Sequence, residues 1–134
     1  MNIVHRDLKL ENVLIDPLSG QVKIIDFGFS IHLYKADERK IPFTCGTPHY
    51  LAPEQAQRLS YYAKPADMWA VGVIFFALLT GKMPFHSGFE NELYRLIMSG
   101  KYQYPINLTN YISKDAKRVI ANLLQVLPFK RVTA

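Results

Sequence analysis

A run of ten apolar residues, 70–79, limits what this 134-residue chain can fold into more than any other feature. It lies inside a helical pattern that runs from about Asp67 to Thr80, where Gly81 and Pro84 supply stop signals. A helix that is apolar around its whole circumference is expected to be buried on all sides. Because the run is about half of the roughly 20 residues that cross a bilayer, we predict a core helix and no membrane partner.

Two further helices are predicted after this core helix. The first covers about residues 90–99, ends at Gly100, and should be amphipathic and half exposed. Its apolar stripe comprises Leu93, Leu96 and Ile97. The second begins after Ser113, a good N-cap, and is ended by Pro128. Its apolar stripe comprises Ala116, Val119, Ile120, Leu123 and Leu124.

The first half of the chain favours strands and loops. Residues 13–15 and 22–25 are short β-prone runs, and the Pro and Gly between them suit the turn of a hairpin. Residues 26–54 show no sustained period, which predicts a long ordered loop of the kind that is usually functional. The fold class is therefore predicted to be α+β, mostly α-helical, with a small β-hairpin.

Composition narrows the function classes. A hydrophobic content of 49% is enough for one compact core, and 20% charged residues argue against disorder. The net charge is +5, but Lys and Arg are interrupted by acids, as in residues 35–40, so we expect a solvated surface and no nucleic-acid partner. The single Cys45 and the absence of a targeting pattern at the start favour a cytoplasmic or nuclear location.

Two motifs carry the chemistry. Residues 5–12 read HRDLKLEN, and residues 26–28, just after the second predicted strand, read DFG. An isolated Asp or Asn in a loop is usually a turn or capping residue. Five fixed positions of the first motif, followed in order and context by the second, make coincidence very improbable.

These motifs resemble the catalytic loop and metal-binding segment of eukaryotic-type serine/threonine protein kinases. Residues 46–54, GTPHYLAPE, are similar to the end of a kinase activation segment, so the resemblance covers nearly the whole chain. It implies that residues 1–134 form a partial kinase domain, from the catalytic loop to the helix that precedes the last helix of the C-terminal lobe. Residues 26–30 and 43–47 are more weakly similar to the calmodulin-dependent group.

The resemblance implies a site that binds ATP with Mg²⁺ and a protein substrate with a Ser or Thr acceptor. Asp7 would accept or orient the proton of the acceptor hydroxyl, and Lys9 would place an ammonium beside the transferring phosphate. Thr47 is implied to contact both residues, as in serine/threonine kinases. Asn12 and Asp26 would supply the oxygen ligands that Mg²⁺ prefers.

Other residues are implied to bind the nucleotide or to support the site. Glu11 stands where the kinase backbone approaches the ribose, and Leu14 where an apolar side chain lies under the adenine ring, although a plain core position suits Leu14 equally well. His5 and Phe27 are implied to be packed structural residues.

Two long-range contacts are also implied. Asp67 should hold the backbone of the catalytic loop, or it acts only as an acid that favours the helix dipole. Arg131 should pair with Glu54 of the Ala-Pro-Glu motif.

The sequence departs from the family pattern in three ways. Phe43 stands where many such kinases have their activating phosphosite, so we hypothesise that an upstream kinase phosphorylates Thr44 and that Arg6 binds the phosphate. Leu127 replaces the usual Asp before Pro128, which suggests a local change in capping.

The third departure is that no Gly-rich loop, strand lysine or partner glutamate precedes His5. The N-terminal lobe is therefore expected to be absent, and the chain alone to be nearly inactive. The alternative is a truncated, noncatalytic kinase-like protein that acts by binding partners or substrates.

Overall fold

The predicted core helix lies within α2 (Ala63–Thr80), the longest helix of the computed structural model, which describes residues 2–33, 40–42 and 44–134. It begins four residues earlier than predicted, because Pro65 in the first turn is compatible with helical backbone. It ends as predicted, with Gly81 at φ 66° donating its N–H to the Ala77 carbonyl.

The expectation that α2 is buried on all sides is wrong. Trp69, Val73 and Phe76 are buried, but Leu78 is 67% exposed, since no element among the described residues covers the outer side of the last turn. By length and composition alone α2 could cross a membrane, yet half of it is buried inside the structure. The buried side of α2 therefore packs at the centre of the hydrophobic core.

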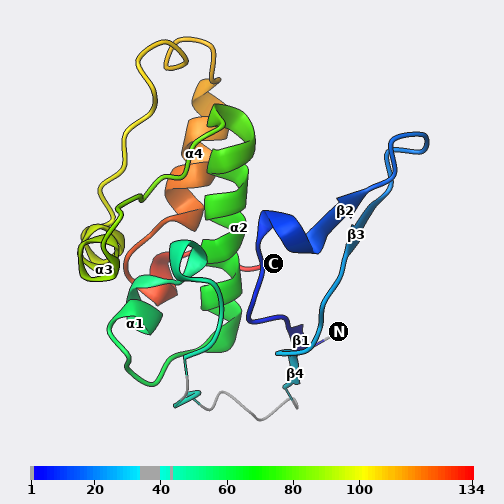
Figure 1. Cartoon of the computed structure of the whole chain (residues 1–134), viewed down its shortest axis with the longest axis vertical. Coiled ribbons are helices and arrows are strands. Elements are labelled where there is room, and N and C mark those ends of the chain that lie inside the picture. The colour runs from blue at the N-terminus through cyan, green and yellow to red at the C-terminus, as the bar shows by residue number, and fades with distance from the viewer. Residues whose placement is uncertain (1, 34–39, 43) are drawn as a thin grey trace.

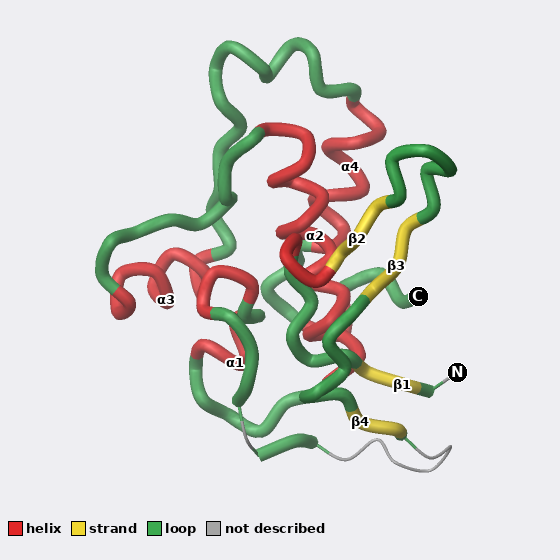
Figure 2. Tube along the Cα trace, turned by 45° about the vertical axis from the view of Figure 1, so that its right-hand side comes forward, coloured by secondary structure: helices red, strands yellow, loops and turns green. Residues whose placement is uncertain are grey.

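Helix α4 (Lys114–Leu123) packs along α2, side by side in both views (Figures 1 and 2). The Ser113 hydroxyl accepts the Ala116 N–H at 3.1 Å, which confirms the predicted N-cap. Ile120 and Leu123 of the predicted stripe are buried, whereas Val119 is exposed. The helix ends at Leu123, before Pro128, which begins the short 3₁₀ helix η3 (Pro128–Lys130).

The other helices complete the helical part of the chain. Helix α3 (Glu90–Ser99) has the predicted bounds, buries Leu93 and Ile97, and ends at Gly100 with φ 64°. The short helix α1 (Pro53–Ala56) contacts α3. Together with α2 and α4, these helices enclose the hydrophobic core.

Two small antiparallel sheets lie beside the helices (Figure 2). The predicted hairpin is formed by β2 (Val13–Ile15) and β3 (Val22–Ile24), with Leu14 opposite Lys23. It projects away from the helices (Figure 1). Strands β1 (Ile3–Val4) and β4 (Ile31–His32) pair with each other and were not predicted, because two-residue strands carry no periodic signal.

The predicted long loop, residues 26–54, holds β4, the 3₁₀ helix η2 (Pro48–Tyr50) and the start of α1. Phe43 and most of the mixed-charge residues 35–40 lie outside the described residues. The chain is mostly helical with small sheets, as predicted.

Candidate functional site

The loop that carries the first motif is fixed to α2 by one carboxylate. Asp67 accepts the backbone N–H of His5 at 2.7 Å with Oδ2 and that of Arg6 at 3.0 Å with Oδ1. Burial raises the pKa of Asp67, and the two N–H donors offset part of this effect. The implied role of Asp67 is therefore seen directly, and it positions the residues that follow.

His5 joins this loop to the end of the hairpin. Its ring is buried, Nδ1 accepts the Asp7 N–H at 3.3 Å, and Nε2 lies 2.9 Å from the Ile25 carbonyl. One tautomer, with the proton on Nε2, satisfies both contacts, so His5 is the packed residue that the resemblance implied. Phe27 contacts the His5 ring at 4.9 Å between centroids, but it is 50% exposed, so its predicted core position is wrong.

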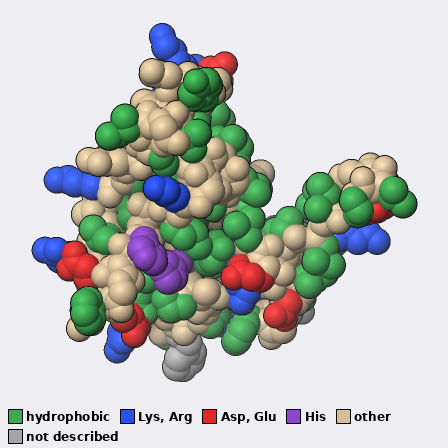
Figure 3. Space-filling view, turned by 45° about the horizontal axis from the view of Figure 1, so that its top comes forward, with side chains coloured by type: hydrophobic (Ala, Val, Ile, Leu, Met, Phe, Trp, Pro, Cys, Tyr) green, Lys and Arg blue, Asp and Glu red, His purple; other side chains and the backbone are tan. Residues whose placement is uncertain are grey.

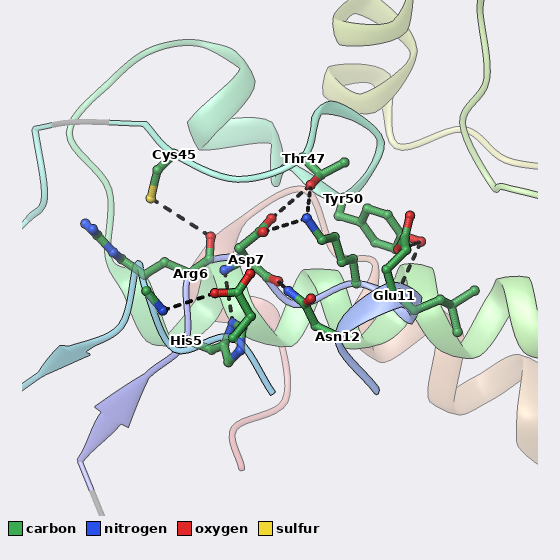
Figure 4. A network of polar contacts seen from close by, with 12 residues as sticks. His5, Arg6, Asp7, Glu11, Asn12, Cys45, Thr47 and Tyr50 are labelled. Atoms are coloured by element: carbon green, nitrogen blue, oxygen red, sulfur yellow. Dashed lines mark hydrogen bonds and ion pairs between the residues drawn. The ribbon is translucent and has the colours of Figure 1, made fainter. Parts of the chain in front are cut away.

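Asp7, Lys9 and Thr47 form a closed triangle of polar contacts (Figure 4). The Lys9 ammonium lies 2.8 Å from Asp7 Oδ2 and 3.0 Å from Thr47 Oγ1, and the Thr47 hydroxyl lies 2.9 Å from Asp7 Oδ1. Asp7 is buried. The hydrogen bond to Asp7 raises the pKa of Lys9, although partial burial opposes it, so Lys9 is a cation at neutral pH.

Asn12 and Asp26 are brought to the same region by backbone contacts. Asn12 lies in the 3₁₀ helix η1 (Leu10–Asn12), and its Nδ2 donates to the Asp7 carbonyl at 2.9 Å. The Ile25 N–H donates to the Asn12 carbonyl at 3.0 Å. Asp26 is the residue that follows Ile25, so this contact brings its backbone close to Asn12. The negative charges of Asp7, Glu11 and Asp26 all act to raise the pKa of Lys9.

The side-chain oxygens of Asn12 and Asp26 are of the type that Mg²⁺ prefers. The contact of Asn12 Nδ2 with Asp7 leaves Asn12 Oδ1 available to a metal, and the exposed Asp26 carboxylate accepts a long 3.3 Å contact from the Gly28 N–H among the residues that the structure describes. Among the described residues, no three His, Cys, Asp or Glu side chains gather in a way that could hold a metal. Few protein ligands suit Mg²⁺, which keeps waters and substrate phosphates as its other ligands.

The two residues predicted to approach the nucleoside are both exposed. Glu11 Oε2 accepts the Tyr50 hydroxyl at 3.4 Å, and Leu14 on β2 is 51% exposed. A plain core position for Leu14 is therefore wrong in this structure. Tyr50 was not predicted; its hydroxyl also accepts the Leu10 N–H at 3.4 Å, so it ties η2 to η1.

Gln55, another residue that the sequence did not reveal, contacts the backbone on both sides of η2. Gln55 Oε1 accepts the Ala52 N–H at 3.0 Å, and its Nε2 donates to the Cys45 carbonyl at 3.4 Å. Thr44 is exposed and donates to the Gln55 carbonyl at 3.4 Å. An exposed hydroxyl is compatible with modification, and phosphorylation of Thr44 stays a prediction.

The predicted pair between Glu54 and Arg131 is bidentate. Both guanidinium N···O distances are 2.7 Å, and Arg131 also donates to backbone carbonyls that include Pro65 at 2.9 Å. The guanidinium lies 5.0 Å from the centre of the Trp69 ring. This pair therefore links the end of the 26–54 loop to the C-terminal residues and to α2.

Comparisons with known proteins identify the family of this chain. The family model described as protein kinase domain matches residues 1–134. The chain is 45% identical over 138 residues to the phosphorylase b kinase gamma catalytic chain, liver/testis isoform, of Rattus norvegicus, covering 99% of this chain and 33% of that protein. It is 40% identical over 132 residues to the probable serine/threonine-protein kinase HSL1 of Saccharomyces cerevisiae, covering 98% of this chain and 8% of that one.

A third relative is serine/threonine-protein kinase 33 of Bos taurus, 38% identical over 141 residues, covering 99% of this chain and 29% of that protein. The chain thus spans a third or less of the length of these relatives. Since the family model covers every residue, the chain belongs to the protein kinase domain family.

Proposed function

We propose that this chain is the C-terminal lobe of a serine/threonine protein kinase that transfers the γ-phosphoryl group of ATP to Ser or Thr hydroxyls of protein substrates. The observation that supports this most is the triangle formed by Asp7, Lys9 and Thr47, with contacts of 2.8 to 3.0 Å. Such an arrangement pairs a buried carboxylate with a fixed cation, which phosphoryl transfer needs.

Each residue of the triangle has a distinct role in the proposal. Asp7 orients the acceptor hydroxyl and receives its proton, and Thr47 keeps one carboxylate oxygen directed into the site. Lys9 neutralises charge on the transferring phosphate while its contact with Asp7 fixes its position. Because these groups are already in place, little reorganisation is needed during transfer.

Asn12 and Asp26 hold magnesium, and Leu14 and Glu11 approach the adenosine. Bound magnesium would neutralise phosphate charge. Asn12 is suited to ligation because its amide orientation is fixed by the Asp7 carbonyl. Leu14 presents exposed apolar surface next to this position on β2, where an aromatic ring could cover it.

The test supplies the Gly-rich loop and strand lysine that these 134 residues do not contain. The chain is fused behind the N-terminal lobe of a kinase of the same family, and transfer of labelled phosphate to a protein substrate is measured. We expect transfer to Ser and Thr, and Asp7→Asn should lower kcat by about 10²–10⁴-fold. An exposed acid outside the site, Asp115, serves as the control through Asp115→Asn.

The same assay on the chain alone should show almost no transfer, since phosphate alignment needs both lobes. If the fused protein is folded but inactive, or if Asp7→Asn does not change its rate, the catalytic proposal fails. The chain would then be a noncatalytic kinase-like protein that acts by binding.

A further inference from the structure

Two histidines far apart in the sequence meet on the surface outside the phosphate-transfer residues. The rings of His49 and His86 have centroids 5.7 Å apart and planes inclined by 22°. Figure 3 shows histidine side chains gathered in one patch on the viewed face. His86 is exposed and His49 is half-buried, so solvent reaches the pair.

Both backbones are held by buried neighbours. His49 is the middle residue of η2, where the buried Tyr50 donates its N–H to the Thr47 carbonyl at 2.9 Å. His86 follows Phe85, which is fully buried and stacked on Trp69 at 5.5 Å. The two rings are therefore presented together by the fold, which lowers the entropy cost of binding one ligand with both.

The separation of the rings suits a shared metal ion. Two imidazoles that bind one tetrahedral Zn²⁺ at about 2.0–2.1 Å would have centroids about 5.2 Å apart, by simple geometry. The observed rings are stacked with centroids 5.7 Å apart, so binding one ion requires the rings to turn about their side-chain bonds until a nitrogen of each faces a shared position, a motion that solvent-accessible side chains can make.

We propose that His49 and His86 form a two-histidine site for a divalent transition-metal ion such as Zn²⁺. Imidazole nitrogen favours Zn²⁺, Ni²⁺ and Cu²⁺ over Mg²⁺, so this site differs in chemistry from the oxygen pair of Asn12 and Asp26. No cluster of three or more His, Cys, Asp or Glu ligands occurs among the described residues, so two protein ligands leave positions open for water or an added anion.

The metal site proposed here lies close in the sequence to a residue of the candidate functional site. His49 is two residues from Thr47, whose hydroxyl contacts Asp7 at 2.9 Å. An ion held there would be bound in part by the short 3₁₀ helix that follows Thr47, a residue that the proposed function assigns to the catalytic site. A carboxylate or phosphate group is the class of ligand that would complete its coordination.

Zn²⁺ binding to the 134-residue chain tests the site without any kinase assay. Calorimetric titrations are done with excess Mg²⁺ and with Cys45→Ser in every protein, because a thiolate is a competing ligand. We expect one strong Zn²⁺ equivalent, and His49→Ala and His86→Ala should each weaken it at least about tenfold through loss of chelation. His32→Ala changes a histidine on β4 outside the pair and should leave the affinity unchanged.

Proton spectra of the imidazole rings give a readout that needs no variant of the pair. Both His49 and His86 signals should shift together as the first Zn²⁺ equivalent is added, while buried His5 does not. If only one of them shifts, if either single variant keeps the affinity of the parent protein, or if no strong equivalent is seen, the contact is ring stacking and the metal site is refuted.

Discussion

Asp26 and Arg6 have φ angles of 60° and 68°, a conformation that residues other than glycine rarely adopt. Both lie at the candidate site, one before the exposed Phe27 and one before Asp7. Arg6 is held by its N–H contact to Asp67, and Asp26 follows Ile25, whose N–H donates to the Asn12 carbonyl. A residue in this conformation lowers the stability of the folded state by about 1–3 kcal/mol. It is retained where the surrounding structure determines its backbone conformation.

The strain at Asp26 can be tested by relieving it. Asp26→Gly removes the unfavourable Cβ and loses a long 3.3 Å contact to Gly28 and a negative charge that acts on Lys9, so stability should be unchanged or rise by up to about 1 kcal/mol. Transfer activity of the fused kinase should nevertheless be lost with the proposed magnesium ligand. Urea unfolding of the chain and a phosphate-transfer assay measure the two effects.

Asp16 provides the matched control for this substitution. It lies in the β2–β3 turn without a positive φ and accepts the Leu18 N–H at 3.0 Å. Asp16→Gly should therefore lower stability by about 0.5–1.5 kcal/mol. If Asp26→Gly destabilises the chain as much as Asp16→Gly does, the backbone at Asp26 is not strained.

Residues in the two motifs could be placed from the sequence because their spacing is fixed along the chain. Asp7, Lys9 and Asn12 lie within one loop, and their predicted neighbourhood is the one observed. The contact between His49 and His86 could not be predicted, because 37 positions separate them and no periodic pattern joins them. The exposure of Phe27 depends on which segments cover it, which local residue type does not determine.

At the scale of elements, predictions succeeded where stop and cap residues mark the ends. Gly81, Gly100 and Ser113 end or begin helices as predicted, because the left-handed or capping backbone suits those residues. The β1–β4 pair escaped prediction since its register depends on Val4 packing against α2, a tertiary contact.

The packing of α4 on α2 depends on Gly72. A Cβ added there would lie 2.8 Å from Leu123 Cβ and 2.8 Å from Leu124 Cδ2, closer than packed carbon atoms approach. Gly72→Ala should therefore cost about 1–3 kcal/mol of unfolding free energy even though alanine favours helix.

Gly88→Ala is the control, since it would place a Cβ in open space at ordinary backbone angles. Urea unfolding should show that Gly88→Ala changes the free energy of unfolding very little. Equal stability of the two variants would mean that α2 and α4 separate without cost and that the close approach is not needed.

The attachment of the motif loop to α2 predicts a dependence on pH. Because burial raises the pKa of Asp67, the folded state binds its proton more tightly than the unfolded state does. The contribution of Asp67 to stability is thus largest below about pH 4 and falls as pH rises through the folded-state pKa. Asn cannot titrate, so the stability of the parent chain minus that of Asp67→Asn should decrease between about pH 4 and pH 7.

The size of the stability loss in Asp67→Asn and the direction in which it changes with pH both test this role of Asp67. Asp67→Asn directs an amide N–H at a backbone donor, so it should destabilise the chain by about 1–3 kcal/mol near pH 4. Urea unfolding across this pH range measures the difference. A difference that grows with pH would show that the N–H contacts from His5 and Arg6 outweigh the burial of the carboxylate.

At the scale of the whole molecule, the candidate site lies where the packed helices meet the projecting hairpin (Figure 1). Asp7 and Thr47 are supported by η2 and α2 through buried residues, whereas Leu14 stands on the hairpin. Among the described residues, the proposed catalytic residues therefore rest on buried elements, and the proposed nucleotide contact lies on an exposed one.

Hydrogen exchange should reveal this division. Most side chains of β2 and all those of β3 are exposed, and a two-stranded hairpin is marginally stable by itself. The hairpin amides should therefore exchange at least about tenfold faster than the amides of α2 near Trp69 and Phe76, which open only with the core. Mass spectrometry of peptides from the two regions measures the ratio in one sample. Equal protection would mean that the hairpin opens only together with the helices. Leu14 on β2 would then belong to the same cooperative unit as Asp7.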